Sequence, residues 1–172
     1  MKILIVSGFL GAGKTTFIKR LARNVDQRFA ILENEYGAAG IDGARLGQNR
    51  QGTQKNVWEM TEQCICCIGK KDFAASVLTI ANVVDPEYLI VEPTGVGSLA
   101  RIIENLRQIE YERIQLLSPV TIVDVYSYRH YMAEYPELYQ DQIRSADTII
   151  VSKTEACQAE EKQRIQKFLQ EI

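Results

Sequence analysis

A glycine-rich segment near the amino terminus is the first feature that could do chemistry. Residues 8–15 read G-F-L-G-A-G-K-T and satisfy the pattern G-x-x-x-x-G-K-[ST] between an expected strand and an expected helix. Glycines let successive backbone N–H groups converge on phosphate oxygens, and the helix dipole adds positive charge at the same point. In such a loop Lys14 bridges the β- and γ-phosphates and the Thr15 hydroxyl ligates Mg²⁺. The residues predicted to surround the phosphates are Gly8, Gly11, Ala12, Gly13, Lys14, Thr15 and Thr16.

Acidic residues follow two of the expected strands, where a metal ion or an attacking water would have to be held. Glu33 and Glu35 follow the strand at 28–33, and Glu92 opens the segment E-P-T-G that follows the strand at 88–91. The carboxyl ends of parallel strands form the binding edge of an open α/β sheet. We therefore predict Thr15, Glu33 and Glu92 at Mg²⁺, directly or through water. The predicted catalytic residues are Lys14, Glu92 and Gly95, the last through an N–H that senses the γ-phosphate. The alternative is that these acids are solvated strand ends.

Three cysteines form a second chemical cluster. Cys64, Cys66 and Cys67 stand within one short turn, where a disulfide would be strained. Thiolates select ions such as Zn²⁺, Cu(I) or Fe–S centres. A structural zinc site normally has four protein ligands, and only the distant Cys157 and His130 are left to complete one. Three ligands with an open position suit reversible metal binding. The alternative is a set of reduced, buried cysteines without metal.

The elements that must position these residues alternate along the chain. Short apolar runs predict strands at 2–7, 28–33, 57–60, 88–91, 120–123 and 148–151. Helical periodicity predicts helices from about residue 13, from 72, over 98–109 and from about 158. The helix over 98–109 is predicted to bury Leu99, Ile102, Ile103 and Leu106, and the last helix Ile165, Phe168 or Leu169, and Ile172. This alternation predicts a P-loop α/β fold with a mostly parallel sheet between two helical layers, in one domain over 1–172. The segment 37–56 has neither period and is interpreted as a functional loop.

Composition excludes several classes of function. The 172 residues are 46% hydrophobic and 24% charged, with 20 Lys+Arg against 22 Asp+Glu. This balance gives no electrostatic signal for nucleic acid or an anionic membrane. No apolar run is long enough for a secretory signal or a membrane span, so we expect a reduced, cytoplasmic protein.

The motifs taken together resemble the CobW-type GTPases, which are metallochaperones related to the nickel-insertion GTPases. The resemblance rests on GFLGAGKTT at 8–16, ENEYG at 33–37, CICC at 64–67, EPTG at 92–95 and SKTE at 152–155. It covers essentially the whole chain and implies a GTP-hydrolysing switch that uses Mg²⁺. It further implies that the cysteine motif binds zinc or cobalt for delivery to a client protein, with metal affinity set by the nucleotide. A homodimer across bound nucleotide is a further partner that the resemblance allows.

The resemblance also assigns a base pocket and shows departures. Ser152, Lys153 and Glu155 stand where the family's N-K-x-D motif recognises guanine, with Ser in place of Asn and Glu in place of Asp. The family's histidine-rich tract is missing, and its final strand and separate C-terminal domain do not fit after Ile172.

Two other functions stay open. One is a non-catalytic, nucleotide-regulated metal sensor, and the other is a P-loop ATPase or small-molecule kinase with Arg45 and Arg50 as its only candidate lid residues.

Three further features receive plainer interpretations. The segment 126–139 holds five tyrosines. The helical spacing of Tyr128, Tyr131 and Tyr135 predicts an aromatic helix face packed on the sheet, with a partner-docking patch as the alternative. Cys157 is interpreted as a lone structural thiol. Asp124 ends a strand near the expected site and receives no role.

Overall fold

A computed structural model describes residues 1–24, 27–33, 57–61 and 70–172, with backbone only for 57–61 and 70–72. The strands are β1 (Lys2–Gly8), β2 (Phe29–Glu33), β3 (Val57–Thr61), β4 (Tyr88–Glu92), β5 (Gln115–Leu116), β6 (Val120–Asp124) and β7 (Thr148–Ser152). The helices are α1 (Lys14–Asn24), α2 (Lys70–Val83), α3 (Leu99–Arg107), α4 (Tyr128–Glu134), α5 (Pro136–Arg144) and α6 (Ala159–Glu171). The segment 37–56 and the cysteine cluster lie outside the described residues.

The strands form one parallel sheet in the order β3-β2-β4-β1-β6-β7, and the short β5 also pairs with β1. The chain builds β2, β3 and β4 on one side of β1 and then β6 and β7 on the other. This reversal of direction at β1 is the point where open α/β sheets bind their ligands. The predicted fold class is confirmed, although no sequence pattern predicted β5.

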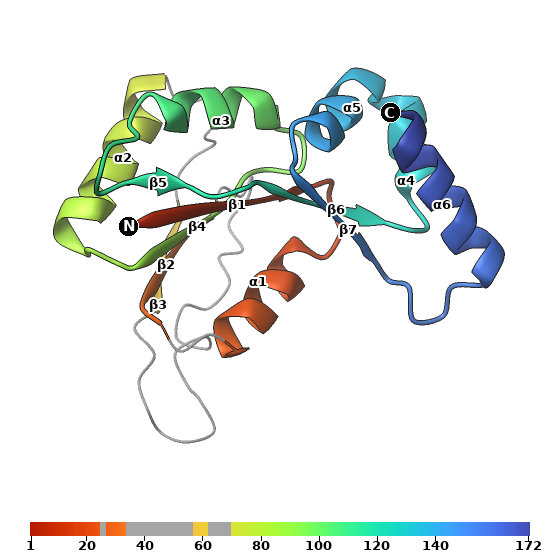
Figure 1. Cartoon of the computed structure of the whole chain (residues 1–172), viewed down its shortest axis with the longest axis horizontal. Helices are drawn as coiled ribbons and strands as arrows, with labels where there is room; N and C mark the ends of the chain where they lie inside the picture. The colour runs from red at the N-terminus through yellow and green to blue at the C-terminus, as the bar shows by residue number, and fades with distance from the viewer. Residues whose placement is uncertain (25–26, 34–56, 62–69) are drawn as a thin grey trace.

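Alternating side chains bury both faces of the sheet. Ile3 and Ile5 of β1 pack with α2 and α3, whereas Val6 packs with Ile18 of α1 on the opposite face. Figure 1 shows α1 below the sheet and α2 and α3 above it, with α4, α5 and α6 gathered at the β7 end. The period of two is the pattern expected for strands covered on both sides.

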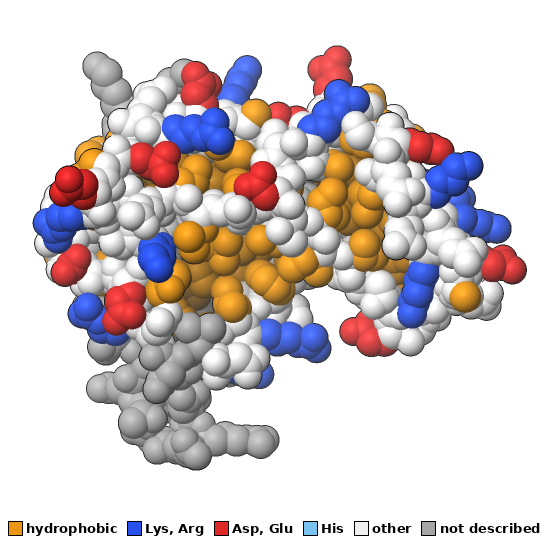
Figure 2. All heavy atoms as spheres, in the orientation of Figure 1, with side chains coloured by type: hydrophobic (Ala, Val, Ile, Leu, Met, Phe, Trp, Pro, Cys, Tyr) orange, Lys and Arg blue, Asp and Glu red, His pale blue; other side chains and the backbone are white. Residues whose placement is uncertain are grey.

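The helices bury the faces that their periodicity predicted. In α3 the residues Leu99, Ile102, Ile103 and Leu106 are all buried, and in α6 Ile165 is buried. Ser98 caps α3, since its side chain accepts a hydrogen bond from the backbone N–H of Arg101 at 3.3 Å. No helix within the described part of the chain is long and apolar enough to cross a bilayer. On the face shown in Figure 2, basic and acidic side chains are interspersed around apolar ones.

Candidate functional site

The turn between β1 and α1 has the backbone geometry of an anion-binding loop. Gly8, Gly11 and Gly13 all have positive φ angles, of 142°, 72° and 99°. A Cβ on Gly8 would lie 2.5 Å from the carbonyl oxygen of Ile122, so this glycine is required by the close approach of β6. A Cβ on Gly11 or Gly13 would meet nothing within 4 Å. The loop therefore combines left-handed backbone with open space beside it, as a phosphate cradle requires.

Lys14 lies over this loop and is almost fully buried. Its ammonium group donates to the carbonyl oxygens of Gly8 at 2.9 Å and Phe9 at 3.3 Å. A buried ammonium group needs such partners because its desolvation is costly. The structure thus places the lysine charge at the loop itself, where an anion bound in the cradle would meet it.

The Thr15 hydroxyl and the Glu92 carboxylate lie in direct contact across the sheet's binding edge. The Thr15 hydroxyl donates to Glu92 Oε1 at 3.1 Å and to Oε2 at 3.3 Å. Glu92 stands beside Glu33 in the register of β4 and β2, and Glu33 is buried. Hydroxyl and carboxylate oxygens are the ligands that Mg²⁺ prefers. These three side chains have the right chemistry and a shared position to hold that ion. The third acid noted in the sequence, Glu35, lies outside the described residues.

The segment after β4 lies directly against the phosphate loop. A Cβ on Gly95 would come within 2.7 Å of the backbone nitrogen of Leu10, which belongs to that loop. Backbone atoms cannot give way as a flexible side chain can, so only glycine fits at this position. The geometry places the Gly95 backbone next to the loop that would hold the γ-phosphate.

The end of β7 connects to the same loop from the other side. The Ser152 hydroxyl donates to the carbonyl oxygen of Ala12 at 2.7 Å. Lys153 follows with a positive φ of 59°, a conformation that is uncommon for a residue with a side chain. Its ammonium group lies 2.7 Å from Asp124 Oδ2. The structure therefore brings Ser152 to the phosphate loop. Glu155, three residues further along the chain, is exposed, and no hydrogen bond joins it to the described residues of that loop.

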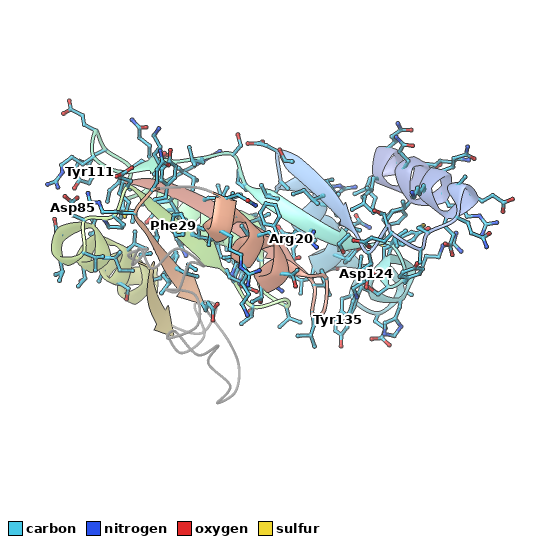
Figure 3. The ribbon with its side chains drawn as sticks, turned by 90° about the horizontal axis from the view of Figure 1, so that it is seen from below. Arg20, Phe29, Asp85, Tyr111, Asp124 and Tyr135 are labelled. Atoms are coloured by element: carbon cyan, nitrogen blue, oxygen red, sulfur yellow. The ribbon has the colours of Figure 1, made fainter. Side chains whose placement is uncertain are left out.

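Asp124 is the buried carboxylate that organises this end of the sheet. It accepts hydrogen bonds from the Tyr126 backbone N–H and the Ser127 hydroxyl, each at 3.0 Å, in addition to the Lys153 contact. Burial raises the pKa of Asp124, but these hydrogen bonds together hold it below its ordinary value. Asp124 therefore carries a negative charge at neutral pH. In Figure 3, Asp124 and Tyr135 lie away from the end of the molecule that carries Asp85 and Tyr111.

The tyrosine-rich segment forms α4 and the start of α5, which are separated by Tyr135. Of the predicted aromatic face, Tyr128 is buried with Val123 of β6 and Tyr131 is partly buried, whereas Tyr135 is 46% exposed. The buried Tyr139 was not part of the predicted face. The ring centroid of Phe9, in the phosphate loop, lies 4.7 Å from that of Tyr131 and 4.9 Å from that of Tyr139. The sequence did not predict this contact, which places an aromatic cluster behind the nucleotide site.

The cysteine motif, Cys64, Cys66 and Cys67, lies outside the described residues. Within the described ranges, no three His, Cys, Asp or Glu side chains are grouped to hold a metal ion. Cys157 lies just before α6, and its thiol contacts Glu161 Oε2 at 3.4 Å. Desolvation and this hydrogen bond raise its pKa above the ordinary value. The geometry therefore gives Cys157 the character of an inert thiol.

Sequence reasoning missed two residues at this edge of the sheet. Asp124 was noted without a role, although an acid at the end of a strand beside a predicted site is a usable signal. Gln142 of α5 donates to the carbonyl oxygens of Gly95 and Gly97, and nothing in its sequence surroundings marked it.

Comparison with known proteins agrees with this geometry. Residues 2–172 match the family model described as the CobW/HypB/UreG nucleotide-binding domain. The chain belongs to this family. It is 31% identical over 170 residues to the zinc chaperone YeiR of Escherichia coli, covering 97% of this chain and 51% of the relative. It is also 30% identical over 182 residues to the zinc chaperone CobW of a Sinorhizobium species, and the match covers 90% of this chain and 51% of that relative.

Solved structures of family members share the fold. The Zn(II)-bound YjiA GTPase of E. coli superposes with a TM-score of 0.70 at 21% identity, covering 98% of this chain and 54% of that one. HypB of Helicobacter pylori in complex with nickel gives a TM-score of 0.60 at 20% identity, covering 96% of this chain and 73% of that one. The chain spans about half the length of the curated relatives it matches.

Proposed function

We propose that this chain binds GTP with Mg²⁺ at the loop 8–15, hydrolyses it, and uses the nucleotide state to control a transition metal held by cysteine thiolates. The observation that carries the nucleotide part is the contact between the Thr15 hydroxyl and the Glu92 carboxylate at 3.1 Å, beside a buried Lys14. These three groups are the minimum that phosphoryl transfer asks of a protein. Family membership of residues 2–172 supports the same reaction.

Each residue has a role that follows from its position. Lys14 and the loop N–H groups hold the phosphates, and Gly95, packed on the loop, places its N–H for the γ-phosphate. Thr15, Glu33 and Glu92 are the residues that would hold Mg²⁺. When bound, this ion neutralises charge on the β- and γ-phosphate oxygens. Glu92 also orients the attacking water.

The guanine base is assigned to the end of β7. Ser152 fixes the start of the motif to the phosphate loop, and the Asp124 carboxylate holds the Lys153 ammonium group. The aliphatic stem of Lys153 then forms a surface for the base, and the Glu155 carboxylate accepts the guanine N–H groups. Adenine offers no such pair of donors, so this assignment predicts a preference for GTP over ATP.

The nucleotide part is tested by turnover of GTP and ATP with Mg²⁺ in the wild type, in Lys14→Met and in Lys19→Met. Lys19 lies on the same helix and serves as a matched control for the loss of one charge. Losing a charge-assisted contact weakens binding by about 1.5–3 kcal/mol, or roughly 10- to 150-fold. We expect this loss of GTP affinity in Lys14→Met alone. Equal turnover in the two variants, or a preference for ATP in the wild type, contradicts the proposal.

The metal part rests on the chemistry of Cys64, Cys66 and Cys67. Three thiolates with an open position suit Zn²⁺ or Co²⁺ that must be released again. The relatives YeiR and CobW are zinc chaperones, which supports a cargo role for the metal here. We propose delivery to a client protein in the cytoplasm, with a homodimer as a further assembly.

Metal binding is tested by titrating Co²⁺ and following thiolate-to-cobalt charge-transfer absorption. We expect one Co²⁺ per chain in the wild type and in Cys157→Ser, because Cys157 is held by Glu161 near α6. Cys66→Ser should lose the absorption band. A band that survives Cys66→Ser, or that disappears in Cys157→Ser, contradicts the assignment. Metal binding without any GTP turnover would favour the sensor alternative.

A further inference from the structure

A buried glutamine on α5 holds the segment that follows β4. The side chain of Gln142 is 1% exposed, and its amide nitrogen donates to the carbonyl oxygens of Gly95 at 3.0 Å and Gly97 at 3.1 Å. These two carbonyls belong to the loop 93–98, named here the sensor loop. Both donor hydrogens of one amide group are thus used on one short stretch of backbone.

The position of Gln142 is itself fixed to the sheet. The backbone carbonyl oxygen of Gln142 accepts a hydrogen bond from the Thr121 hydroxyl of β6 at 2.8 Å, and this contact is buried. The neighbouring Asp141 accepts from the backbone N–H of Leu99 at 2.7 Å, at the first turn of α3. Two consecutive residues of α5 therefore connect the sheet, the sensor loop and the start of α3.

The same helix also contacts the phosphate loop. The ring of Tyr139 lies 4.9 Å from that of Phe9, and a Cβ on Gly95 would lie 2.7 Å from the Leu10 nitrogen. The sensor loop is thus confined between the phosphate loop and α5. A change at the nucleotide has a short path of direct contacts to α5.

The direction of the Gly95 carbonyl determines what the loop offers to an anion. In a trans peptide the C=O and N–H groups point in opposite directions, and no cis peptide occurs in the described residues. Because the Gly95 carbonyl points at Gln142, the Val96 N–H of the same peptide points away from α5. The Gly97 carbonyl orients the Ser98 N–H in the same manner. Without Gln142 these carbonyls would be free to turn toward bound phosphate, where they would be repelled.

The other end of the amide group has an unusual environment. Among the residues that the structure describes, the Gln142 Oε1 atom is buried with no hydrogen-bond partner. A buried acceptor without a partner costs about 1–3 kcal/mol. A hydrophobic residue of similar size would avoid this cost, so packing alone does not account for glutamine here. The two hydrogen bonds to the sensor loop do account for it.

We propose that Gln142 is a positioning residue for GTP hydrolysis, holding the carbonyls of the sensor loop on α5 and so keeping the Gly95 N–H in place for the γ-phosphate. The proposal rests on the proposed function, since it concerns how the nucleotide site distinguishes GTP from GDP. It also identifies α5 and the start of α3 as the parts of the molecule that respond to the γ-phosphate.

The test compares Gln142→Met with Gln140→Met. Methionine keeps the length of the side chain and removes both donors. Gln140 lies on the same helix, and the hydrogen bonds from this helix to Gly95 and Gly97 come from Gln142. The readouts are kcat and KM for GTP, and the affinities for GDP and for a non-hydrolysable GTP analogue. For Gln142→Met we expect kcat and the preference for the analogue over GDP to fall about tenfold each, as for the loss of two neutral hydrogen bonds. GDP affinity should change less than about twofold, because the phosphate and base contacts are intact.

A purely structural role would lower thermal stability and leave the analogue-to-GDP ratio unchanged. That result, or a ratio that rises, overturns the proposal. Where Gln142→Met fails to fold, Gln142→Leu removes both donors without adding a charge and is expected to show the same change. Hydrogen exchange at the Gly97 amide, which donates to the Thr94 carbonyl within the sensor loop at 3.0 Å, gives a measurement without nucleotide, and faster exchange in Gln142→Met than in Gln140→Met is expected. If the wild type itself neither binds nor hydrolyses GTP, the proposed function fails; if it does both and Gln142→Met matches the control, only this inference fails.

Discussion

Replacing Gly95 by alanine tests the close contact between the sensor loop and the phosphate loop. The added Cβ would lie 2.7 Å from the Leu10 nitrogen and 3.1 Å from the Phe9 carbonyl carbon, both backbone atoms of the phosphate loop. Gly97 in the same loop offers a matched control. Its Cβ would lie 3.3 Å from the Thr94 hydroxyl oxygen, which can rotate away.

The magnitude follows from the difference between the two variants. Neither glycine has a positive φ, so neither substitution strains the backbone. Both reduce the entropy of the unfolded chain by the same amount, and this contribution cancels. Overpacking a tight contact costs about 1–3 kcal/mol, and we expect Gly95→Ala to be less stable than Gly97→Ala by that amount.

The contact also predicts an effect on catalysis. If the sensor loop relieves the clash by moving away from the phosphate loop, the Gly95 N–H is misplaced for the γ-phosphate. A barrier raised by the same 1–3 kcal/mol corresponds to a loss of kcat of about 5- to 150-fold. GDP affinity should be nearly unchanged. Urea unfolding of both variants without nucleotide, together with GTP turnover, provides the comparison. Equal unfolding free energies and equal turnover in the two variants would refute this reasoning.

Three smaller predictions concern the other side of the site. Ser152→Ala loses the hydrogen bond to the Ala12 carbonyl, so we expect the free energy of unfolding in urea to fall by about 1 kcal/mol and GTP to bind more weakly. An unchanged urea midpoint contradicts the importance of this contact. The lowered pKa of Asp124 stabilises the fold above the unfolded value of about 3.9, and this contribution disappears as pH falls through the folded pKa. The wild type should therefore be more stable than Asp124→Asn at neutral pH, partly through the Lys153 ion pair, and this advantage should shrink below about pH 4. A difference in unfolding free energy that stays constant with pH contradicts the lowered pKa of Asp124. In a variant that keeps only Cys157, alkylation should have its midpoint above about pH 8.5, and a lower midpoint would contradict the raised pKa.

The fold was largely predictable because its signals are local. Glycine, lysine and threonine at fixed spacing predict the turn between β1 and α1. Apolar periodicity placed the buried face of α3 on Leu99 and Leu106 correctly. The parallel sheet follows from alternating strands and helices, whereas the order of the strands around β1 was not predicted. Strand β5 was missed because two residues carry no periodicity and are held only by pairing with β1.

The site was predictable only where its residues belong to contiguous motifs. Thr15 and Glu92 stand 77 residues apart, yet each is marked by its own motif, and both were predicted at the same ion. Gln142 reaches Gly95 across 47 residues, and its function depends on tertiary contact alone. Asp124 was visible as a strand-end acid, but its link to Lys153 requires the positive φ that only the structure shows.

Coupling between nucleotide and metal is the central claim, and cobalt affinity measures it most directly. Co²⁺ is titrated into the protein without nucleotide, with GDP, and with a non-hydrolysable GTP analogue, each with Cys66→Ser as the control. The cysteine motif lies between Glu33 and Glu92 in the sequence, so a γ-phosphate that fixes these acids should alter the thiolates. We predict affinities that differ by about 5- to 150-fold between the GDP and GTP-analogue forms, as in other coupled sites. Equal affinity in all three forms would contradict the account and leave a P-loop protein whose metal does not respond to its nucleotide.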